Sequence, residues 1–268
     1  MENLTDSQWE VYITTKINNV LNSLVSEAIS GSLASITAAS DSRFPQAIDH
    51  TLLKQDATPA QIDKLCDEAI KFGFKSCCVN GLYIPQVTKR LQGSLSIPCC
   101  VVGFPLGAGS AKSKALETKD AIESGAEEID VVLPLGLLLS NPPQYYELFH
   151  HLKTVIDAAG LAPVKVILET GLIPTPELKI AASVIAAEAG AAYVKTSTGF
   201  AGGTGATKED VGLMYRAVQY TARVKIKASG GVRTFETCQE MFNAGAERIG
   251  TSSGVSLMQN ITAATDSY

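Results

Sequence analysis

Two short motifs each place a lysine near the end of a β-like run of residues. The first motif, AYVKTSTG at residues 192–199, contains Lys195, and the second, VKIKASGG at residues 224–231, contains Lys227. If the two runs are successive strands, their ammonium groups lie close together. A nearby like charge lowers the pKa of a lysine, and a neutral lysine can attack a carbonyl carbon to form a Schiff base. The pair therefore predicts amine-catalysed carbonyl chemistry, with one lysine as the nucleophile and the other lowering its pKa.

Further polar side chains stand at the ends of other predicted strands, namely Asp49, Cys78, Asp130 and Glu169. An enzyme built on a ring of parallel strands has its active site at the carboxyl ends of those strands. These residues are therefore candidates to act with the two lysines. Asp130 is expected to shuttle protons between carbinolamine and imine rather than to neutralise Lys195.

The same predicted strands carry further polar and charged residues on the strand faces that the candidate residues occupy. Alternate residues of a strand face the same side. By this rule, the residues that share a face with the candidates are Glu128, Lys165, Tyr193 and Lys225. An unpaired buried ion costs several kcal/mol or changes its protonation. The interior is therefore expected to hold either a satisfied ion network or groups that tune the lysines.

Glycine-rich segments follow the predicted strands at this end of the fold. Gly199 and residues 202–205 follow the first lysine motif, Gly230 and Gly231 follow the second, and residues 250–254 precede the last predicted helix. Glycine lets the backbone approach a ligand closely, and amides at a helix N-terminus attract an anion without any net positive charge. Each segment alone predicts no more than a turn, but together they favour a phosphate site.

From residue 47 onward, predicted strands alternate with predicted helices. The strands are expected at 47–50, 75–79, 98–103, 127–132, 163–168, 192–196, 224–228 and 247–251. The helices are expected at 58–72, 84–92, 111–124, 143–159, 175–189, 207–221 and 234–244, with a last one after Ser253. Strict alternation of eight units predicts an α/β fold, a (β/α)8 TIM barrel. An open doubly wound sheet is the alternative, but it favours a Gly-x-Gly-x-x-Gly turn after the first strand, where the sequence has none.

Residues 1–45 are expected to form an N-terminal extension to a barrel domain at 46–268. Apolar residues recur every three or four positions, which predicts an amphipathic helix over residues 1 to about 30. Ser7 and Glu10 match a capping box at its start. The small polar stretch that follows is typical of a linker. The helix is expected to pack on the barrel or to mediate self-association, as in a homodimer.

Composition argues against several classes of function. The net charge is −5 without a block of basic residues, which disfavours binding to nucleic acid or to anionic membranes. The sequence shows no apolar run long enough to span a bilayer and no basic leader. The six cysteines form no C-x-x-C pair, so buried strand thiols are expected rather than a metal or redox site. The expected compartment is the reducing cytosol.

From about residue 47 to its end, the chain resembles the deoxyribose-phosphate aldolase family, whose members are class I, metal-free aldolases on a (β/α)8 barrel. The matching segments, in order, are IDHTLLK (48–54), CVN (78–80), VGFPLG (102–107), EIDVV (128–132), KVILETG (165–171), VKTSTGF (194–200), KASGGVR (227–233) and RIGTSS (248–253). The two lysine motifs are highly specific to this family. The resemblance implies no cofactor, and a phosphorylated sugar and aldehydes as the small-molecule partners.

The resemblance also implies roles for individual residues. Lys195 matches the lysine that forms the Schiff base, Lys227 the second lysine that perturbs it, and Asp130 the aspartate of the proton relay. Thr198 lies beside the nucleophile in the substrate pocket. The residues that match the phosphate-binding loops are Gly199, Gly230, Gly231, Ser252 and Ser253. Those expected to support the site from around it are Asp49, Cys78, Lys165 and the terminal Tyr268.

The implied reaction is the reversible cleavage of 2-deoxy-D-ribose 5-phosphate to D-glyceraldehyde 3-phosphate and acetaldehyde, in deoxynucleoside catabolism. Another class I aldolase or a transaldolase-like transferase is an alternative, although such a protein would lack the second lysine motif. A catalytically silent sugar-phosphate sensor is a further alternative, against which the presence of Lys195, Lys227 and Asp130 argues.

Some features depart from the family pattern. Pro134 stands where many members carry asparagine, which affects the loop after the fourth strand. The N-terminal extension is longer than in compact bacterial members. Tyr268 matches a terminal tyrosine that folds over the site in some members, although a chain end is more often disordered. Cys78 matches a cysteine beside the pocket, and buried packing is expected of it rather than reaction with aldehyde products.

Overall fold

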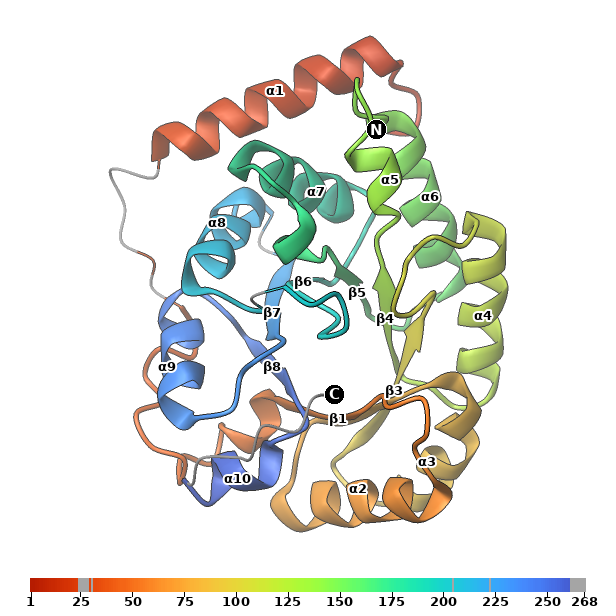
Figure 1. The fold of residues 1–268 in the computed structure, drawn as a ribbon, viewed down its shortest axis with the longest axis vertical. Helices are drawn as coiled ribbons and strands as arrows, with labels where there is room; N and C mark the ends of the chain where they lie inside the picture. The colour runs from red at the N-terminus through yellow and green to blue at the C-terminus, as the bar shows by residue number, and fades with distance from the viewer. Residues whose placement is uncertain (24–28, 30, 204, 222, 261–268) are drawn as a thin grey trace.

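A closed ring of eight parallel strands forms the centre of the molecule (Figure 1). The computed structural model describes residues 1–268 except 24–28, 30, 204, 222 and 261–268. Each strand pairs with the next along the chain, and the last pairs with the first. The strands are β1 Ile48–Leu52, β2 Ser76–Val79, β3 Ile97–Val102, β4 Glu128–Val132, β5 Val164–Ile167, β6 Tyr193–Lys195, β7 Lys225–Ser229 and β8 Arg248–Thr251. The predicted (β/α)8 barrel is confirmed, and the open sheet is excluded.

Helices surround the barrel and connect its strands (Figure 1). They are α1 Asp6–Ser23, α2 Pro59–Phe72, α3 Ile84–Leu91, α4 Ala111–Glu123, α5 Leu135–Leu138, α6 Tyr145–Ala158, α7 Pro176–Glu188, α8 Lys208–Val218, α9 Phe235–Asn243 and α10 Gly254–Met258. Three short 3-10 helices are η1 Pro45–Ala47, η2 Gly81–Tyr83 and η3 Thr170–Leu172. The sequence did not predict α5, which follows Pro134 and has only four residues, too few to show a helical period. In the described part of the chain, no helix is long and apolar enough to cross a membrane.

Threonine side chains fix where several helices begin. At α2, the Thr58 hydroxyl accepts a hydrogen bond from the Gln61 amide, while the Gln61 side chain accepts one from the Thr58 amide. Thr175, Thr207 and Thr234 cap α7, α8 and α9 in the same way, each accepting from the amide three residues later. A cap of this kind stabilises a helix by about 1 kcal/mol. These helix starts were predicted from the sequence.

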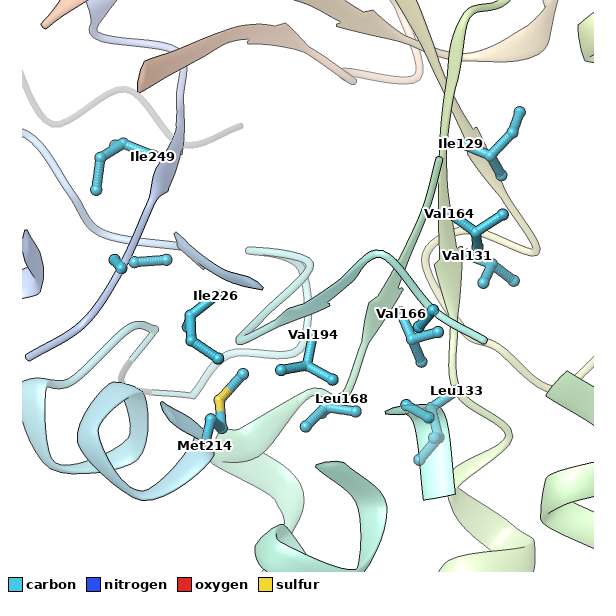
Figure 2. Packing of buried hydrophobic residues seen from close by; sticks show 14 of the residues in the cluster. Ile129, Val131, Leu133, Val164, Val166, Leu168, Val194, Met214, Ile226 and Ile249 are labelled. Carbon is cyan, nitrogen blue, oxygen red and sulfur yellow. The ribbon is translucent and has the colours of Figure 1, made fainter. Parts of the chain in front are cut away.

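The strands alternate between two faces, as predicted. Val194 of β6 and Ile226 of β7 point away from the barrel axis and pack toward the helices near Met214 of α8 (Figure 2). The residues that follow them, Lys195 and Lys227, therefore point into the barrel. The main apolar core lies between the strands and the helices, and the barrel interior holds the buried charged side chains together with a second, small apolar cluster.

Lys225 does not join the buried residues, although alternation assigned it the inward face. Its side chain is exposed and forms an ion pair with Glu247, with Nζ 3.2 Å from Oε2. Lys225 is the first residue of β7, so it stands at the amino end of the barrel, where side chains reach solvent. Alternation predicts which face a residue takes but not its depth in the barrel. The expectation of a buried Lys225 is wrong.

The N-terminal helix α1 packs on the outside of the barrel, across α6, α7 and α8 (Figure 1). Its apolar stripe is buried there, with Trp9 and Ile13 both fully covered. The Trp9 ring lies 4.9 Å from the ring of Phe149 on α6. The helix thus packs on the barrel, the first of the two roles expected of it. The boundary between residues 45 and 46 stays a prediction.

Thr5 and Gln8 form the capping box of α1, rather than Ser7 and Glu10. The Thr5 hydroxyl accepts from the Gln8 amide at 3.4 Å, and Gln8 Oε1 accepts from the Thr5 amide at 2.8 Å. Both pairs have the spacing of a capping box, so the sequence pattern alone did not separate them. The described helix runs to Ser23, and most of its predicted continuation lies outside the described residues.

Replacing Trp9 with alanine is expected to lower the free energy of unfolding by about 3–5 kcal/mol, because a fully buried indole is lost and a cavity is left. Urea or guanidinium unfolding measures the change. Val11→Ala is the matched control on the same helix, because the Val11 side chain is 68% exposed. A Trp9→Ala protein as stable as the control would mean that α1 contributes nothing to the stability of the barrel.

Candidate active site

Asp130 on β4 is the meeting point of three lysines. Its Oδ2 atom lies 2.7 Å from Nζ of Lys195 and 2.7 Å from Nζ of Lys227. Its Oδ1 atom lies 2.7 Å from Nζ of Lys165. The strand register produces this meeting, because Asp130 pairs with Lys165 and Lys195 pairs with Lys227 along the ladder. The structure thus brings together the three predicted catalytic residues, all of them buried.

Asp49 on β1 is a second carboxylate of the same cluster. Its Oδ2 atom lies 2.6 Å from Nζ of Lys227. Its Oδ1 atom accepts hydrogen bonds at 2.7 Å from Nη1 of Arg248 and at 2.7 Å from the Ser76 hydroxyl. Asp49, expected to support the site, is therefore a second carboxylate partner of Lys227 beside Asp130.

Glu128 and Arg248 complete the ion network. Glu128 Oε2 lies 2.6 Å from Nζ of Lys165 and 3.1 Å from Nη1 of Arg248, and Nη2 of Arg248 donates to the Tyr193 hydroxyl at 3.1 Å. Sequence reasoning included Glu128 but missed Arg248. Strand alternation applied to β8 could have found it, because Arg248 occupies the first inward-facing position of that strand.

The charges in this cluster hold one another ionised. Burial by itself favours the neutral forms, so it raises the pKa of Asp130 and lowers that of Lys227. The ammonium groups of Lys165, Lys195 and Lys227 outweigh burial and hold the pKa of Asp130 well below its ordinary value. Asp130 and Asp49 likewise hold the pKa of Lys227 above its ordinary value. At neutral pH, Asp130 is a fixed anion and Lys227 a fixed cation.

Positive charges outnumber negative ones in the cluster. Its cations are Lys165, Lys195, Lys227 and Arg248, and its carboxylates are Asp49, Glu128 and Asp130. Among the described residues, Lys195 meets one carboxylate oxygen, which it shares with Lys227. Of these four cations, Lys195 therefore has the fewest ion-pair contacts within the described residues.

The expectation that Asp130 leaves Lys195 unneutralised is wrong, because a separation of 2.7 Å is an ion pair. Alternation correctly turned both side chains inward. It carried no information on their separation across the barrel, which depends on strand tilt and stagger. Asp130 is therefore close enough to exchange a proton with Lys195 by direct contact.

A pocket of about 150 Å³ opens at the carboxyl ends of β5, β6 and β7. Three of the predicted phosphate residues line it, namely Gly199, Gly230 and Gly231. The backbone of Gly205 approaches so closely that a Cβ atom there would lie 2.4 Å from the Gly230 carbonyl oxygen. Only glycine permits this approach, so the glycines bring two loops together as the wall of one pocket.

Arg233 and Ser197 also line this pocket, and sequence reasoning assigned neither of them to the site. Arginine pairs readily with phosphate oxygens. The Ser197 hydroxyl is buried and makes no hydrogen bond within the described part of the protein. Its position two residues after Lys195, on the same face, was the signal that could have found it. The residues that line the pocket therefore include a guanidinium and an unbonded hydroxyl that could bind an anion.

Thr198 is held in place by Glu169. The Thr198 amide donates to both carboxylate oxygens of Glu169 at 3.2 Å, and its hydroxyl donates to Oε2 of the same group. Glu169 follows β5 in a left-handed conformation with φ of 58° and lines the pocket. Thr198 is not among the described residues that line the pocket, so its expected place in the substrate pocket stays a prediction.

Two other predicted residues lie apart from the pocket lining. Ser252 and Ser253 follow β8, where the Ser253 amide donates to the Thr251 hydroxyl at 3.0 Å, and neither serine is among the described residues that line the pocket. Tyr268 lies outside the described residues. The roles of these three residues stay predictions.

All six cysteines are buried, as expected, but only four of them lie on strands, because Cys66 lies on α2 and Cys238 on α9. Cys78 packs in a small apolar cluster inside the barrel with Leu53, Cys99 and Val101. Ligand atoms of Cys78, Cys99 and Asp130 lie within 4.8 Å of one another. A metal cation at this point would face the three ammonium groups already bound to Asp130, so electrostatic repulsion disfavours it.

The sequence matches a model of the DeoC/LacD family of aldolases over residues 44–263. It is 49% identical over 224 residues to a deoxyribose-phosphate aldolase of Geobacillus sp., a match that covers 83% of this chain and 98% of the relative. It is 50% identical over 231 residues to one of Carboxydothermus hydrogenoformans, which covers 85% and 99% respectively. These relatives are matched over nearly their whole length, and most of the unmatched part of this chain is its N-terminal extension.

Solved structures of similar fold carry the same description. A crystal structure from Coccidioides immitis, named as a candidate deoxyribose-phosphate aldolase, has a TM-score of 0.87 and 38% identity, and covers 97% of this chain and 98% of its own. A deoxyribose-phosphate aldolase of Aeropyrum pernix, described as tetrameric, has a TM-score of 0.72 and 29% identity, and covers 91% and 95%. The Coccidioides match extends into the N-terminal extension of this chain.

Replacing Asp49 with asparagine is expected to lower the free energy of unfolding by about 3–5 kcal/mol at pH 7, because Lys227 and Arg248 lose a buried counter-charge. The pKa of Asp49 is lowered in the folded protein: burial raises it, but Arg248 and Lys227 outweigh burial. Its stabilisation is therefore complete above the unfolded pKa of about 4 and is lost as the pH falls further.

Denaturant unfolding of both proteins between pH 7 and pH 3 measures this difference. The difference in the free energy of unfolding between the wild type and Asp49→Asn should be constant down to about pH 4 and become smaller below it. Asp56→Asn, at an exposed position after β1, is the control. The stabilising role of the ion network would be contradicted if this difference did not change below pH 4. It would also be contradicted if the difference were no larger than the one caused by Asp56→Asn.

Proposed function

We propose that this chain, which belongs to the DeoC/LacD family of aldolases, is a class I aldolase that reversibly cleaves 2-deoxy-D-ribose 5-phosphate to D-glyceraldehyde 3-phosphate and acetaldehyde. The observation that carries this proposal is the pair of lysines on one carboxylate oxygen, beside a glycine-lined pocket. The names of the curated relatives support the choice of substrate. The reaction would serve the breakdown of deoxyribonucleosides.

Lys195 is the nucleophile in this proposal. Both lysines are buried and both touch Oδ2 of Asp130, but Lys227 has a second carboxylate, Asp49, at 2.6 Å. Two carboxylates keep Lys227 protonated, so it has no lone pair to offer. The number of carboxylate contacts therefore favours Lys195, which is the lysine that the family resemblance also selects.

The proposed reaction begins when neutral Lys195 attacks the C1 aldehyde of the open-chain sugar and forms a carbinolamine. Loss of water gives an iminium ion, which accepts the electron pair of the C2–C3 bond as that bond breaks. The C3 hydroxyl loses its proton, and D-glyceraldehyde 3-phosphate leaves. Protonation of the remaining enamine at C2 and hydrolysis of the imine release acetaldehyde and restore Lys195. Asp130, in direct contact with Nζ, exchanges the protons of the carbinolamine step.

The pocket beside Lys195 binds the phosphate in this proposal. A phosphate dianion needs donors, and Arg233, the Ser197 hydroxyl and the loop amides around Gly199 and Gly230 supply them. The net charge of the protein is negative, so local donors of this kind are required.

Borohydride reduction in the presence of acetaldehyde is expected to fix an ethyl group on Lys195, because only an imine is reduced to a stable amine. Mass spectrometry of the peptides locates the adduct. Lys195→Met should abolish both the adduct and turnover. An adduct on Lys165 or Lys227, or turnover without any adduct, would refute the mechanism.

Replacing Lys227 with leucine is expected to lower kcat by about 100-fold or more at neutral pH. Oδ2 of Asp130 would then pair with Lys195 alone and hold its proton, so the pH optimum should move to alkaline pH. The pH profile of kcat measures both effects. Lys225→Leu, an exposed position on the same strand, is the matched control. Kinetics equal to those of the control would contradict the role given to Lys227.

A further inference from the structure

Helix α4 carries a buried lysine that the proposed chemistry does not use. Lys114 is 1% exposed, and its Nζ donates to the carbonyl oxygens of Gly107 at 2.6 Å and Val132 at 2.7 Å. Within the described residues, it forms no ion pair with a carboxylate. Burial lowers the pKa of Lys114 to about 8. Burying an ammonium group against two neutral carbonyl groups costs free energy. The contacts that Lys114 makes are therefore expected to serve a purpose that offsets this cost.

The two carbonyls belong to different parts of the barrel mouth. Gly107 lies in the loop between β3 and α4, and Val132 is the last residue of β4. The Gly107 amide donates to the Gly103 carbonyl at 2.8 Å, which closes a turn in this loop. The Gly103 amide donates to Oε2 of Glu117, also on α4, at 2.9 Å. Two side chains of α4 thus attach both ends of the turn, and Lys114 joins it to β4.

The loop fits the lysine closely. A Cβ atom at Gly103 would lie 2.7 Å from Cε of Lys114, so the aliphatic part of the side chain packs directly on the loop backbone. A Cβ atom at Gly107 would lie 2.3 Å from the Leu133 carbonyl oxygen, immediately after β4. The lysine, the loop and the end of β4 are therefore packed without space between them.

The turn carries Phe104 to the mouth of the barrel. The Phe104 ring packs edge-on against the ring of Phe200, with centroids 5.1 Å apart, and Phe200 directly follows Gly199 of the pocket. Phe104 also packs on the apolar cluster that contains Cys78 and Cys99. Cys99 in turn donates to Oδ1 of Asp130 at 3.3 Å. The two aromatic rings thus link the loop after β3 to the loop after β6.

We propose that Lys114 is a positioning residue that holds Phe104 against Phe200 as an apolar wall at the mouth of the barrel. The ammonium group does this by tying the loop after β3 to the end of β4. The wall limits the access of water to the imine and presets the shape of the substrate site. The kinetic part of this inference rests on the proposed function, whereas the attachment of the loop does not.

Chymotrypsin cleavage tests the attachment without any substrate. Leu106 lies in the loop and is 81% exposed, and bond 104–105 is protected from this protease because residue 105 is proline. Lys114→Met keeps most of the aliphatic chain and removes the donors, so cleavage after Leu106 should accelerate at least about fivefold. Lys112→Met, an exposed lysine of the same helix, should cleave as the wild type does. Equal rates in the two variants would overturn the inference.

Steady-state kinetics test the position of Phe104. Lys114→Met should raise the KM for 2-deoxyribose 5-phosphate at least about fivefold, and Phe104→Ala should do the same. Because both changes disrupt the same wall, the KM of the double variant should be no higher than that of Phe104→Ala alone. Effects that multiply in the double variant would overturn the inference. The Tm of Lys114→Met should lie within a few degrees of that of the wild type. A higher KM in such a protein reflects the position of Phe104 rather than a loss of stability.

Trapping with acetaldehyde distinguishes failure of this inference from failure of the proposed function. At saturating aldehyde, Lys114→Met should still form the reduced adduct on Lys195, because the ion network is untouched. A wild-type protein that forms no adduct refutes the proposed function and leaves the protease result standing. If Lys114→Met does not fold, Glu117→Gln, which weakens the second attachment of the loop, is measured in its place, with the same outcomes expected.

Discussion

One carboxylate oxygen, Oδ2 of Asp130, binds two ammonium groups at 2.7 Å each, and the rest of the barrel interior depends on that contact. The other oxygen of Asp130 is taken by Lys165, so none of the three lysines has this carboxylate to itself. Lys165 and Lys227 have further carboxylates, whereas Lys195 has no other within the described residues. The cluster therefore keeps most of its charges fixed and leaves one amine weakly compensated, which a Schiff-base lysine requires.

The apolar layer outside the strands makes such an interior possible. A buried ion network contributes little net stability, because desolvation of the ions offsets their mutual attraction. Residues such as Val164, Val166 and Ile249 bury the outward strand faces against the helices (Figure 2). The free energy of folding therefore comes mainly from the layer between strands and helices. That division frees the inward positions of the barrel for charged groups, whose presence is better explained by chemistry than by stability.

Local sequence rules predicted the barrel, because the alternation of elements, the caps and the two-residue period of a strand are all local. The same period turned Lys195 and Lys227 inward correctly. The period does not give the position of a residue along the barrel axis, so it wrongly buried Lys225 at the solvent end of β7. It also does not give distances across the barrel, so it did not predict the 2.7 Å contact of Asp130 with Lys195. The period also places Arg248 on the inward face of β8 and Ser197 two residues after Lys195, but it does not show which inward residues meet a partner from another strand or line a pocket.

The two sides of the barrel mouth are held by different forces. On the side of β5 to β7, consecutive strands and glycine loops pack backbone against backbone, so the geometry follows from the ladder itself. On the side of β3, the turn that carries Phe104 is fixed by two side chains of α4, Lys114 and Glu117. A ladder cannot change without unfolding, but side-chain attachments can be altered one at a time. A substitution at Lys114 or Glu117 would therefore act on the β3 side of the mouth and leave the contacts of Asp130 with the three lysines in place.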